Sequence, residues 1–245
     1  MKSVAITIDD KLVTCRQDTP VLYAALDSGI SIPHLCNNYD VKSSGGSCRI
    51  CIVEAYQGGR MKVVTSCNYP ARDGISIKTD TALIRKLRKG VLEIMLTRAP
   101  RSPEVRKLAE EYGIETESGG SCDNPEFKDT CIACGLCVAI CDEIVGASAI
   151  AMNHRGQTKI PGTPFDQPSK ACIACGACAL GCPTNSISLI DSGDTRDIWG
   201  QSFKMKRCIV CNTPYIAEAQ IDWIVNKTGK DRSFFDRCTD HRQKG

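Results

Sequence analysis

The chain has 245 residues, of which 17 are cysteine and only 3 are histidine, and its formal net charge is +3 at pH 7. A charge this close to balance argues against a protein that binds a polyanion mainly by electrostatic attraction. No apolar run approaches the roughly 20 residues of a membrane span, and charge returns at Asp9 and Asp10, too early for a signal peptide. We therefore expect a cytoplasmic protein, and in that reducing compartment so many cysteines indicate metal ligation.

The first 80 residues have the pattern of strands with one helix. Alternating apolar residues predict a β-hairpin over residues 4–15. An amphipathic pattern predicts a helix over residues 20–28. After a loop rich in glycine, serine and asparagine at 32–47, three further strand-like runs follow, at residues 50–56, 61–66 and 75–78.

Four cysteines lie in this frame with the spacing C-x11-C-x2-C-x15-C, namely Cys36, Cys48, Cys51 and Cys67. A [2Fe–2S] cluster needs four thiolates, two for each iron; the C-x2-C pair can reach around one iron and the loop must bring the other two. Gly45 and Gly46 let the loop fold tightly, so that its N–H groups can donate to sulfur. The alternative is a zinc site from the same cysteines. The surrounding hairpin, helix and glycine-rich loop favour the [2Fe–2S] cluster.

The segments IPHLCNNYDVKSSGGSCRICIVEAY and VTSC carry a family resemblance. They resemble the [2Fe–2S] domain at the N-terminus of the large iron–sulfur subunit of respiratory complex I, and the same domain in the diaphorase part of NAD-linked hydrogenases and in iron-hydrogenases. Plant-type ferredoxins use the spacing C-x4-C-x2-C instead. We therefore expect an α+β protein whose residues 1–80 form a β-grasp [2Fe–2S] ferredoxin domain.

Residues 81–125 are predicted to be a helical linker without metal. Apolar residues recur at helical spacing after a cap at Asp80, and Ser102 is expected to cap a second helix that ends before Gly113. The apolar stripe of the first helix is predicted to contain Leu83, Ile84, Leu87, Val91, Ile94 and Met95.

Two features of the linker bear on function. In the complex I and diaphorase relatives, this stretch usually carries one histidine and three cysteines that hold an extra [4Fe–4S] cluster; here it has no histidine and only Cys122, so that cluster is not expected. Eight lysines and arginines lie between Arg85 and Lys107. They form either a solvated helix face or a docking face for an acidic partner subunit, and without interleaved aromatic residues they do not indicate nucleic acid.

The middle of the chain repeats one motif. CIACGLCVAIC and CIACGACALGCP both follow the bacterial ferredoxin pattern C-x2-C-x2-C-x3-C, in which the fourth cysteine of each run ligates the other cluster. Residues 126–195 are therefore predicted to form a 2[4Fe–4S] ferredoxin domain. Asp142 replaces the proline that follows the first run, which alters the local turn and leaves the ligation intact. The first cluster is assigned Cys131, Cys134, Cys137 and Cys182, and the second Cys172, Cys175, Cys178 and Cys141.

The last group of ligands, in residues 200–245, has the spacing C-x2-C-x26-C-x2-H, with Cys208, Cys211, Cys238 and His241. It suits a tetrahedral Cys3His zinc site that would staple a segment too short to bury much core. An iron–sulfur cluster and no metal are the alternatives. The segment resembles the C-terminal tails of ferredoxin-like subunits in hydrogenase and formate dehydrogenase complexes, in which cysteine takes the last position. Cys15 is expected to be a small buried apolar residue.

Together these motifs describe an electron conduit, because three one-electron centres are predicted on a chain with no nucleotide-binding loop and no nucleophile–base pair. The resemblance implies the iron–sulfur subunit of an NAD(P)-linked complex. Its partners would be a flavin- and NAD(P)-binding iron–sulfur subunit, a small thioredoxin-like [2Fe–2S] subunit, and a nickel–iron hydrogenase or a formate dehydrogenase. Soluble ferredoxin would join them if the complex bifurcates electrons.

Three other readings stay open. The chain could be a free multi-cluster ferredoxin. It could be the iron–sulfur subunit of a succinate dehydrogenase, although that protein uses the plant-type spacing. It could also be a zinc-dependent scaffold or nucleic-acid-binding protein, which would contain little iron.

Overall fold

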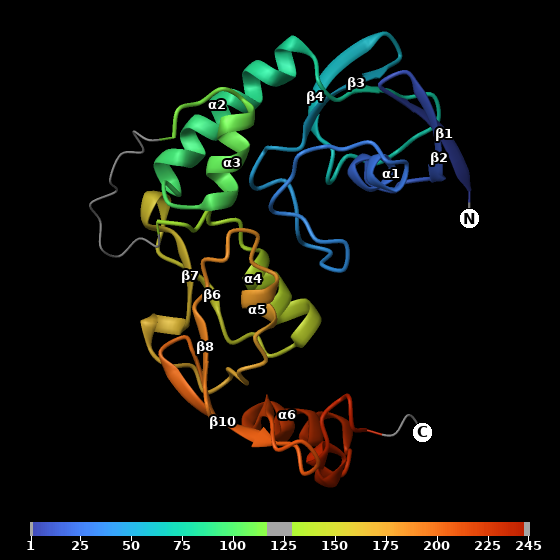
Figure 1. Ribbon diagram of the computed structural model, residues 1–245. Coiled ribbons are helices and arrows are strands. Elements are labelled where there is room, and N and C mark those ends of the chain that lie inside the picture. Colours follow the sequence, from blue (N-terminus) through green and yellow to red (C-terminus); the bar gives the residue numbers. More distant parts are fainter. Residues whose placement is uncertain (1, 117–128, 243–245) are drawn as a thin grey trace. The chain divides into compact units, whose positions relative to one another are not determined.

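A computed structural model describes residues 2–116 and 129–242 (Figure 1). Its contacts divide the chain into two compact units, Met1–Leu136 and Cys137–Gly245, which are described separately. Cys122 and most of the stretch expected to link the second helix to the ferredoxin repeat lie outside the described residues. Within the described ranges, no helix has both the length and the apolar character that a membrane span requires.

The first unit begins with a mixed five-stranded sheet in the order β2-β1-β5-β3-β4. Strand β1 pairs antiparallel with β2 and parallel with β5, while β3 pairs antiparallel with β4 and β5. The hairpin and the later strands are confirmed. Their bounds are β1 Ser3–Ile8, β2 Lys11–Arg16, β3 Ile52–Gln57, β4 Arg60–Thr65 and β5 Ser76–Lys78.

Helix α1 (Val21–Asp27) packs on this sheet and closes the first core. The alternation in β1 places Val4, Ile6 and Ile8 on the buried face, where each is at most 3 % exposed. Val21 and Leu22 of α1 are fully buried against them. The sheet and the helix fit the β-grasp layout that the sequence predicts, and they leave the loop between α1 and β3 free to carry ligands.

Two helices follow, α2 (Ala82–Arg98) and α3 (Pro103–Glu111), and they pack against each other (Figure 1). The cap of α3 is as predicted, because the Ser102 hydroxyl accepts from the Val105 N–H at 3.3 Å. The cap of α2 is Thr81 and not Asp80. The Thr81 hydroxyl accepts from the Ile84 N–H at 3.2 Å, whereas the Asp80 carboxylate pairs with Arg85 at 2.6 Å.

The buried face of α2 also differs from the predicted stripe. Leu83, Leu87 and Ile94 are 39 %, 39 % and 72 % exposed, and the fully buried positions include Arg88 and Leu92. The true face is displaced because Arg88, a residue that hydrophobic periodicity counts as polar, points into the unit and finds buried acceptors there. Periodicity therefore placed Ile84 and Met95 correctly on the buried face of the helix, but not the three exposed positions.

The second unit holds the rest of the ferredoxin repeat. The first run continues through α4 (Leu136–Ala139) into a π-helical turn at Ile140–Val145, and the second continues through α5 (Ala177–Leu180). The insertion between the runs forms a two-stranded sheet of β6 (Ala151–Asn153) and β7 (Ile160–Gly162). His154 lies at its surface, with Nε2 3.4 Å from the Asp166 carboxylate. Short 3-10 turns occupy Gly156–Thr158, Pro164–Asp166 and Arg232–Asp236.

A four-stranded antiparallel sheet, in the order β11-β10-β9-β8, follows the repeat and was not predicted from the sequence. Its β9–β10 hairpin, with a turn at Trp199 and Gly200, joins the two regions that were expected at residues 126–195 and 200–245. Helix α6 (Glu218–Thr228) follows the last strand of this sheet and ends at Gly229 with φ +68°. The strands are β8 Leu189–Ser192, β9 Thr195–Ile198, β10 Gln201–Arg207 and β11 Pro214–Ala217.

Candidate metal centres

The structure brings the first four predicted ligands together inside Met1–Leu136. Each is at most 6 % exposed: Cys36, Cys48, Cys51 and Cys67. The thiols pair by hydrogen bonding, Cys36 with Cys48 and Cys51 with Cys67. Hydrogen bonding from its partner lowers the pKa of Cys48 to about 5 and that of Cys51 to about 6, whereas the pKa values of Cys36 and Cys67 are raised. Two pairs of adjacent thiols, with one thiolate readily formed in each, suit a metal group that takes two sulfurs per ion.

The glycines of the loop form a cradle around this sulfur group. Gly45 has φ +103°, and a Cβ there would lie 3.1 Å from the Cys67 Sγ and 3.0 Å from the Asn37 Nδ2. The Gly46 N–H donates to the Cys67 Sγ at 3.1 Å, and the Cys48 N–H donates to the Cys36 Sγ at 3.3 Å. A four-thiol donor set, backbone donors aimed at sulfur and a cradle without side chains fit a [2Fe–2S] cluster.

Replacement of Gly45 by alanine is expected to lower the [2Fe–2S] content of the purified protein. The left-handed backbone costs an alanine about 1–2 kcal/mol, and the added methyl group also presses on the Cys67 sulfur. Gly74→Ala is the matched control, because Gly74 has φ +72° with nothing within 4 Å of the added Cβ. Iron analysis with visible spectra would measure the difference. Equal cluster loss in the two variants would show that backbone strain, and not the cradle, limits assembly.

The four cysteines predicted to hold the second [4Fe–4S] cluster all lie within Cys137–Gly245. One cavity is lined by all four predicted cysteines, Cys141, Cys172, Cys175 and Cys178. The Ala149 N–H donates to the Cys141 Sγ at 3.3 Å. Burial raises the pKa of Cys178 to about 11, and the positive charge of iron, if bound there, would favour its thiolate. The remaining lining is mostly apolar and includes Val145, Ile150, Ile173 and Ile198.

One residue that lines this cavity and one that contacts its lining could not be predicted from the sequence. Trp199 lines the cavity, and a hydrogen bond with its side chain opposes the effect of burial on the Cys178 pKa. The Arg196 guanidinium donates to the Ala174 carbonyl at 3.2 Å and is held by the Asp191 carboxylate at 2.7 and 2.8 Å. Both residues come from the β9 hairpin, downstream of the cysteine run, so no ligand spacing could reveal them. The one nearby feature of the sequence that could have indicated a hairpin here was the pair Trp199 and Gly200, which forms a turn.

The predicted ligands of the other [4Fe–4S] cluster are divided between the two units. In Met1–Leu136, Cys134 packs with Ile132 against the core that contains Cys36 and Cys48. In Cys137–Gly245, Cys137 and Cys182 belong to one hydrophobic cluster. The Ser186 N–H donates to the Cys182 Sγ at 3.3 Å. Because Cys131 and Cys134 lie in the other unit, the joint ligation by all four cysteines stays a prediction.

The C-terminal ligands also meet. The ligand atoms of Cys208, Cys211, Cys238 and His241 all lie within 4.8 Å of one another. The His241 Nδ1 is 3.1 Å from the Cys238 Sγ and 4.0 Å from the Cys208 Sγ. Burial alone would raise the pKa of Cys208, but the N–H groups of Cys211, Cys238 and Val210 lower it to about 6. One thiolate is therefore available near neutral pH, and the group fits a tetrahedral metal ion.

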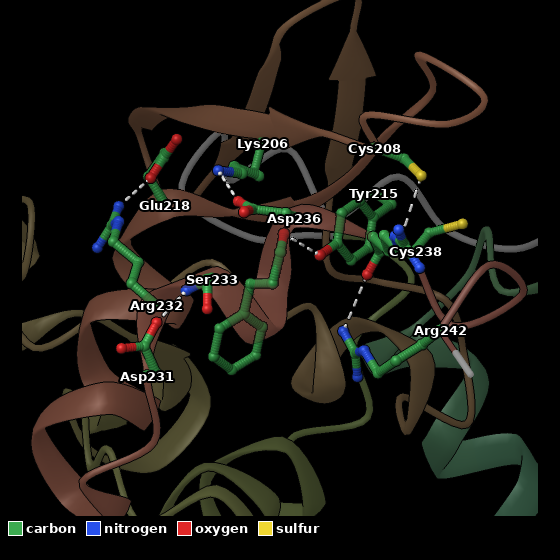
Figure 2. A network of polar contacts seen from close by, with 12 residues as sticks. Lys206, Cys208, Tyr215, Glu218, Asp231, Arg232, Ser233, Asp236, Cys238 and Arg242 are labelled. Atoms are coloured by element: carbon green, nitrogen blue, oxygen red, sulfur yellow. Dashed lines mark hydrogen bonds and ion pairs between the residues drawn. The ribbon is translucent and has the colours of Figure 1, made fainter. Parts of the chain in front are cut away.

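A polar network braces this site (Figure 2). The Tyr215 hydroxyl donates to the Phe235 carbonyl at 2.6 Å, and Lys206 pairs with Asp236 at 2.8 Å. Arg232 forms ion pairs with Glu218 and Asp222 of α6. These contacts tie β10, β11 and α6 to the turn that precedes Cys238, and surface ion pairs of this kind contribute little stability individually.

Comparison with known proteins defines the class of protein. Residues 1–82 match the family described as a 2Fe-2S iron-sulfur cluster binding domain, and residues 130–186 match a 4Fe-4S dicluster domain. The predicted ligands of the first three centres all fall inside these ranges, while the C-terminal group lies outside them. The chain is therefore an iron–sulfur protein with a 2Fe-2S domain followed by a 4Fe-4S dicluster domain.

Its relatives are subunits of oxidoreductases. It is 33 % identical over 204 residues to NADPH-Fe(3+) oxidoreductase subunit alpha of Geobacter sulfurreducens, matching 75 % of this chain and 24 % of that protein. It is 27 % identical to the NADP-reducing hydrogenase subunit HndD of Solidesulfovibrio fructosivorans, over 76 % of this chain and 36 % of that subunit. The mitochondrial 78 kDa subunit of NADH-ubiquinone oxidoreductase from Neurospora crassa is also 27 % identical, over 67 % of this chain and 25 % of that subunit.

The chain thus spans between about a quarter and a third of the length of these relatives. In one solved structure, the match covers a larger share of the related chain. A chain of an NAD+-reducing [NiFe]-hydrogenase in the H2-reduced state superimposes with a TM-score of 0.55 and 26 % identity, covering 66 % of this chain and 75 % of the hydrogenase chain. The chain is related to the iron–sulfur subunits of NAD(P)-linked oxidoreductases and hydrogenases.

Proposed function

We propose that this chain relays single electrons between a flavin subunit that oxidises NAD(P)H and a catalytic hydrogenase subunit, through one [2Fe–2S] and two [4Fe–4S] clusters. The observation that carries the proposal is the shared core of Met1–Leu136. There, Cys36 and Cys48 of one ligand set and Cys134 of another pack around the same apolar face of α2. Because electron transfer slows steeply with distance, ligands of two centres on one packed core favour transfer between them.

The residues of the chain have clear parts in such a relay. An iron–sulfur cluster, when bound, accepts and releases one electron, and its potential depends on charge, hydrogen bonds to sulfur and solvent exposure. The Gly46 and Ala149 N–H groups donate to ligand sulfurs in two different centres. Apolar side chains such as Ile150 and Ile173 keep water from the Cys172 set. Together they hold each centre rigid, so little reorganisation accompanies a change of charge.

A hydrogenase is the partner that the comparisons favour. The match to the NAD+-reducing [NiFe]-hydrogenase covers three quarters of that chain, whereas the other relatives are matched over only a part of their length. A separate flavin subunit and a small thioredoxin-like [2Fe–2S] subunit complete the proposed complex, which we place in the cytoplasm. The same relay role in a formate dehydrogenase, and electron bifurcation with soluble ferredoxin, are variants of this proposal that differ only in the partners.

The C-terminal group has a structural role in the proposal. Zinc bound by Cys208, Cys211, Cys238 and His241 would staple β10, β11 and α6 together. Zinc has no redox chemistry, so this site would support the relay without carrying electrons.

Anaerobic purification tests the relay directly. We expect about ten irons per chain, from one [2Fe–2S] and two [4Fe–4S] clusters, with distinct paramagnetic signals on reduction. Iron analysis and electron paramagnetic resonance would measure both. Fewer than about six irons per chain, or no reducible paramagnetic species, would refute the proposal.

The partner is tested separately by the behaviour of the chain in native extract. As a subunit, it is expected to co-purify with a flavin protein and a hydrogenase large subunit, in a complex much larger than the 26.6 kDa of the chain. Mass spectrometry would identify the companions. A species that elutes near the mass of the single chain would instead identify a free ferredoxin, and a molybdopterin protein among the companions would point to formate.

A further inference from the structure

One buried cation lies beside the [2Fe–2S] ligands. Arg88 of α2 is only 2 % exposed, whereas its neighbours Arg85, Lys86 and Lys89 are exposed. It is among the largest fully buried side chains, and it lies one helical turn before Leu92, which packs with Cys36 and Cys48. A guanidinium retains its proton at any ordinary pH, so this position holds a permanent positive charge in the interior.

The Arg88 guanidinium donates hydrogen bonds to the residues on both sides of a predicted cluster ligand. Its Nε donates to the Ile50 carbonyl at 3.0 Å and its Nη2 donates to the Ile52 carbonyl at 2.7 Å. These residues flank Cys51, whose own carbonyl accepts from the Ser66 hydroxyl at 2.8 Å. Three consecutive peptide carbonyls around the ligand are therefore fixed, two of them by Arg88.

No anionic side chain balances this charge in the described ranges. The third contact of Arg88 is the neutral Tyr112 hydroxyl, at 3.0 Å, and no carboxylate lies within ion-pair distance of it. The one acid buried among the described residues, Glu54, accepts instead from the Thr81 and Tyr56 hydroxyls, at 2.6 Å each. A buried charge without a counter-ion is costly, and dipoles of neutral groups compensate it only in part.

Resting on the proposed [2Fe–2S] centre, we propose that Arg88 is the buried counter-charge of that cluster and sets its reduction potential. Four thiolates and two sulfides outweigh the charge of the irons, and reduction adds one more negative charge. A fixed cation on the peptide of Cys51 stabilises the reduced form more than the oxidised form, because the attraction grows with the cluster charge. Arg88 therefore raises the reduction potential of the cluster. Helix α2 lies almost entirely beyond the residues that match the 2Fe-2S domain, so a residue outside that domain adjusts the potential of its cluster.

The test is a redox titration of the [2Fe–2S] electron paramagnetic resonance signal, with the [4Fe–4S] signals of the same sample as internal reference. Arg88→Gln removes the charge and is expected to shift the reduction equilibrium at least tenfold toward the oxidised form, which is 59 mV for one electron. Arg88→Lys keeps the charge and is expected to stay close to wild type. Tyr112→Phe, the matched control, removes one hydrogen bond without a change of charge and is expected to leave the potential in place.

Each outcome decides something different. An unchanged potential in Arg88→Gln with the cluster retained, or an equal shift in Tyr112→Phe, would overturn the counter-charge role. If the Arg88→Gln protein loses the cluster, the Tyr112→Glu variant is used in its place. This variant keeps the guanidinium and places a carboxylate beside it, so the potential of the [2Fe–2S] cluster is expected to fall. An unchanged potential in this variant would also overturn the counter-charge role. Absence of a [2Fe–2S] signal from the wild-type protein would refute the proposed centre itself.

Discussion

Replacement of Cys141 by serine is expected to abolish the [4Fe–4S] cluster of the second cysteine run, although Cys141 belongs to the first run. The four cysteines that line one cavity of the second unit are Cys141, Cys172, Cys175 and Cys178. The oxygen of serine is a harder ligand than the sulfur of a thiolate and suits an iron–sulfur centre poorly. Iron is expected to fall by about four per chain, and the paramagnetic signal of one cluster is expected to disappear.

Iron content alone does not tell which cluster is lost, so the decisive measurement compares four single serine variants. If the fourth cysteine of each run ligates the other cluster (crossed ligation), Cys141→Ser is expected to have the spectrum of Cys175→Ser. Cys182→Ser is then expected to have the spectrum of Cys134→Ser. With ligation run by run, Cys141→Ser would instead match Cys134→Ser, and the cavity assignment would be wrong. Cys15→Ser is the control, because Cys15, in β2, belongs to none of the predicted ligand sets, and this variant is expected to keep every signal.

Candidate ligand positions could be predicted from the sequence because cluster chemistry fixes the spacing of the cysteines. A thiolate must reach iron, so Cys172, Cys175 and Cys178 follow at intervals of three, and their spacing is the same before and after folding. Strand alternation was equally direct in β1, where one face is buried and the other is not. These features depend on local geometry, which the order of residues encodes.

Arg88 and Trp199 could not be found in this way, because their roles depend on segments far apart in the sequence. Arg88 is 38 residues from Ile50, whose carbonyl it binds. Hydrophobic periodicity scores an arginine as a surface residue, so only part of the buried face of α2, including Ile84 and Met95, was predicted correctly. Trp199 reaches the cluster cavity only because β8 and β9 form a hairpin, and those short strands, exposed at positions such as Asp191, have no strong alternation.

Loss of metal from the C-terminal site is expected to unfold that end of the chain and leave the iron–sulfur centres in place. The second unit has little apolar core there: Ile221 and Phe235 are the largest buried side chains among the described residues 216–242. Structural zinc contributes about 10–16 kcal/mol in zinc-finger peptides, comparable to the entire stability of about 5–15 kcal/mol of a domain. Cys238→Ser is expected to reduce zinc from about one per chain to none.

Hydrogen exchange distinguishes this outcome from general destabilisation. In Cys238→Ser, the amides of β11 and α6 are expected to lose protection, while those of β1 and β3 exchange as in the wild-type protein, because that sheet has its own core. Asp231→Ala is the control: it removes the side chain that accepts from the Ser233 N–H at 2.8 Å in the same module without touching a ligand, and zinc should stay bound. If elemental analysis found iron in place of zinc, this site would be a fourth electron carrier. Such a redox centre would add its own signal on reduction. If the amides of α6 stayed fully protected from exchange without any metal, the polar network of Tyr215 and Arg232 would be sufficient to keep the C-terminal end of the chain folded.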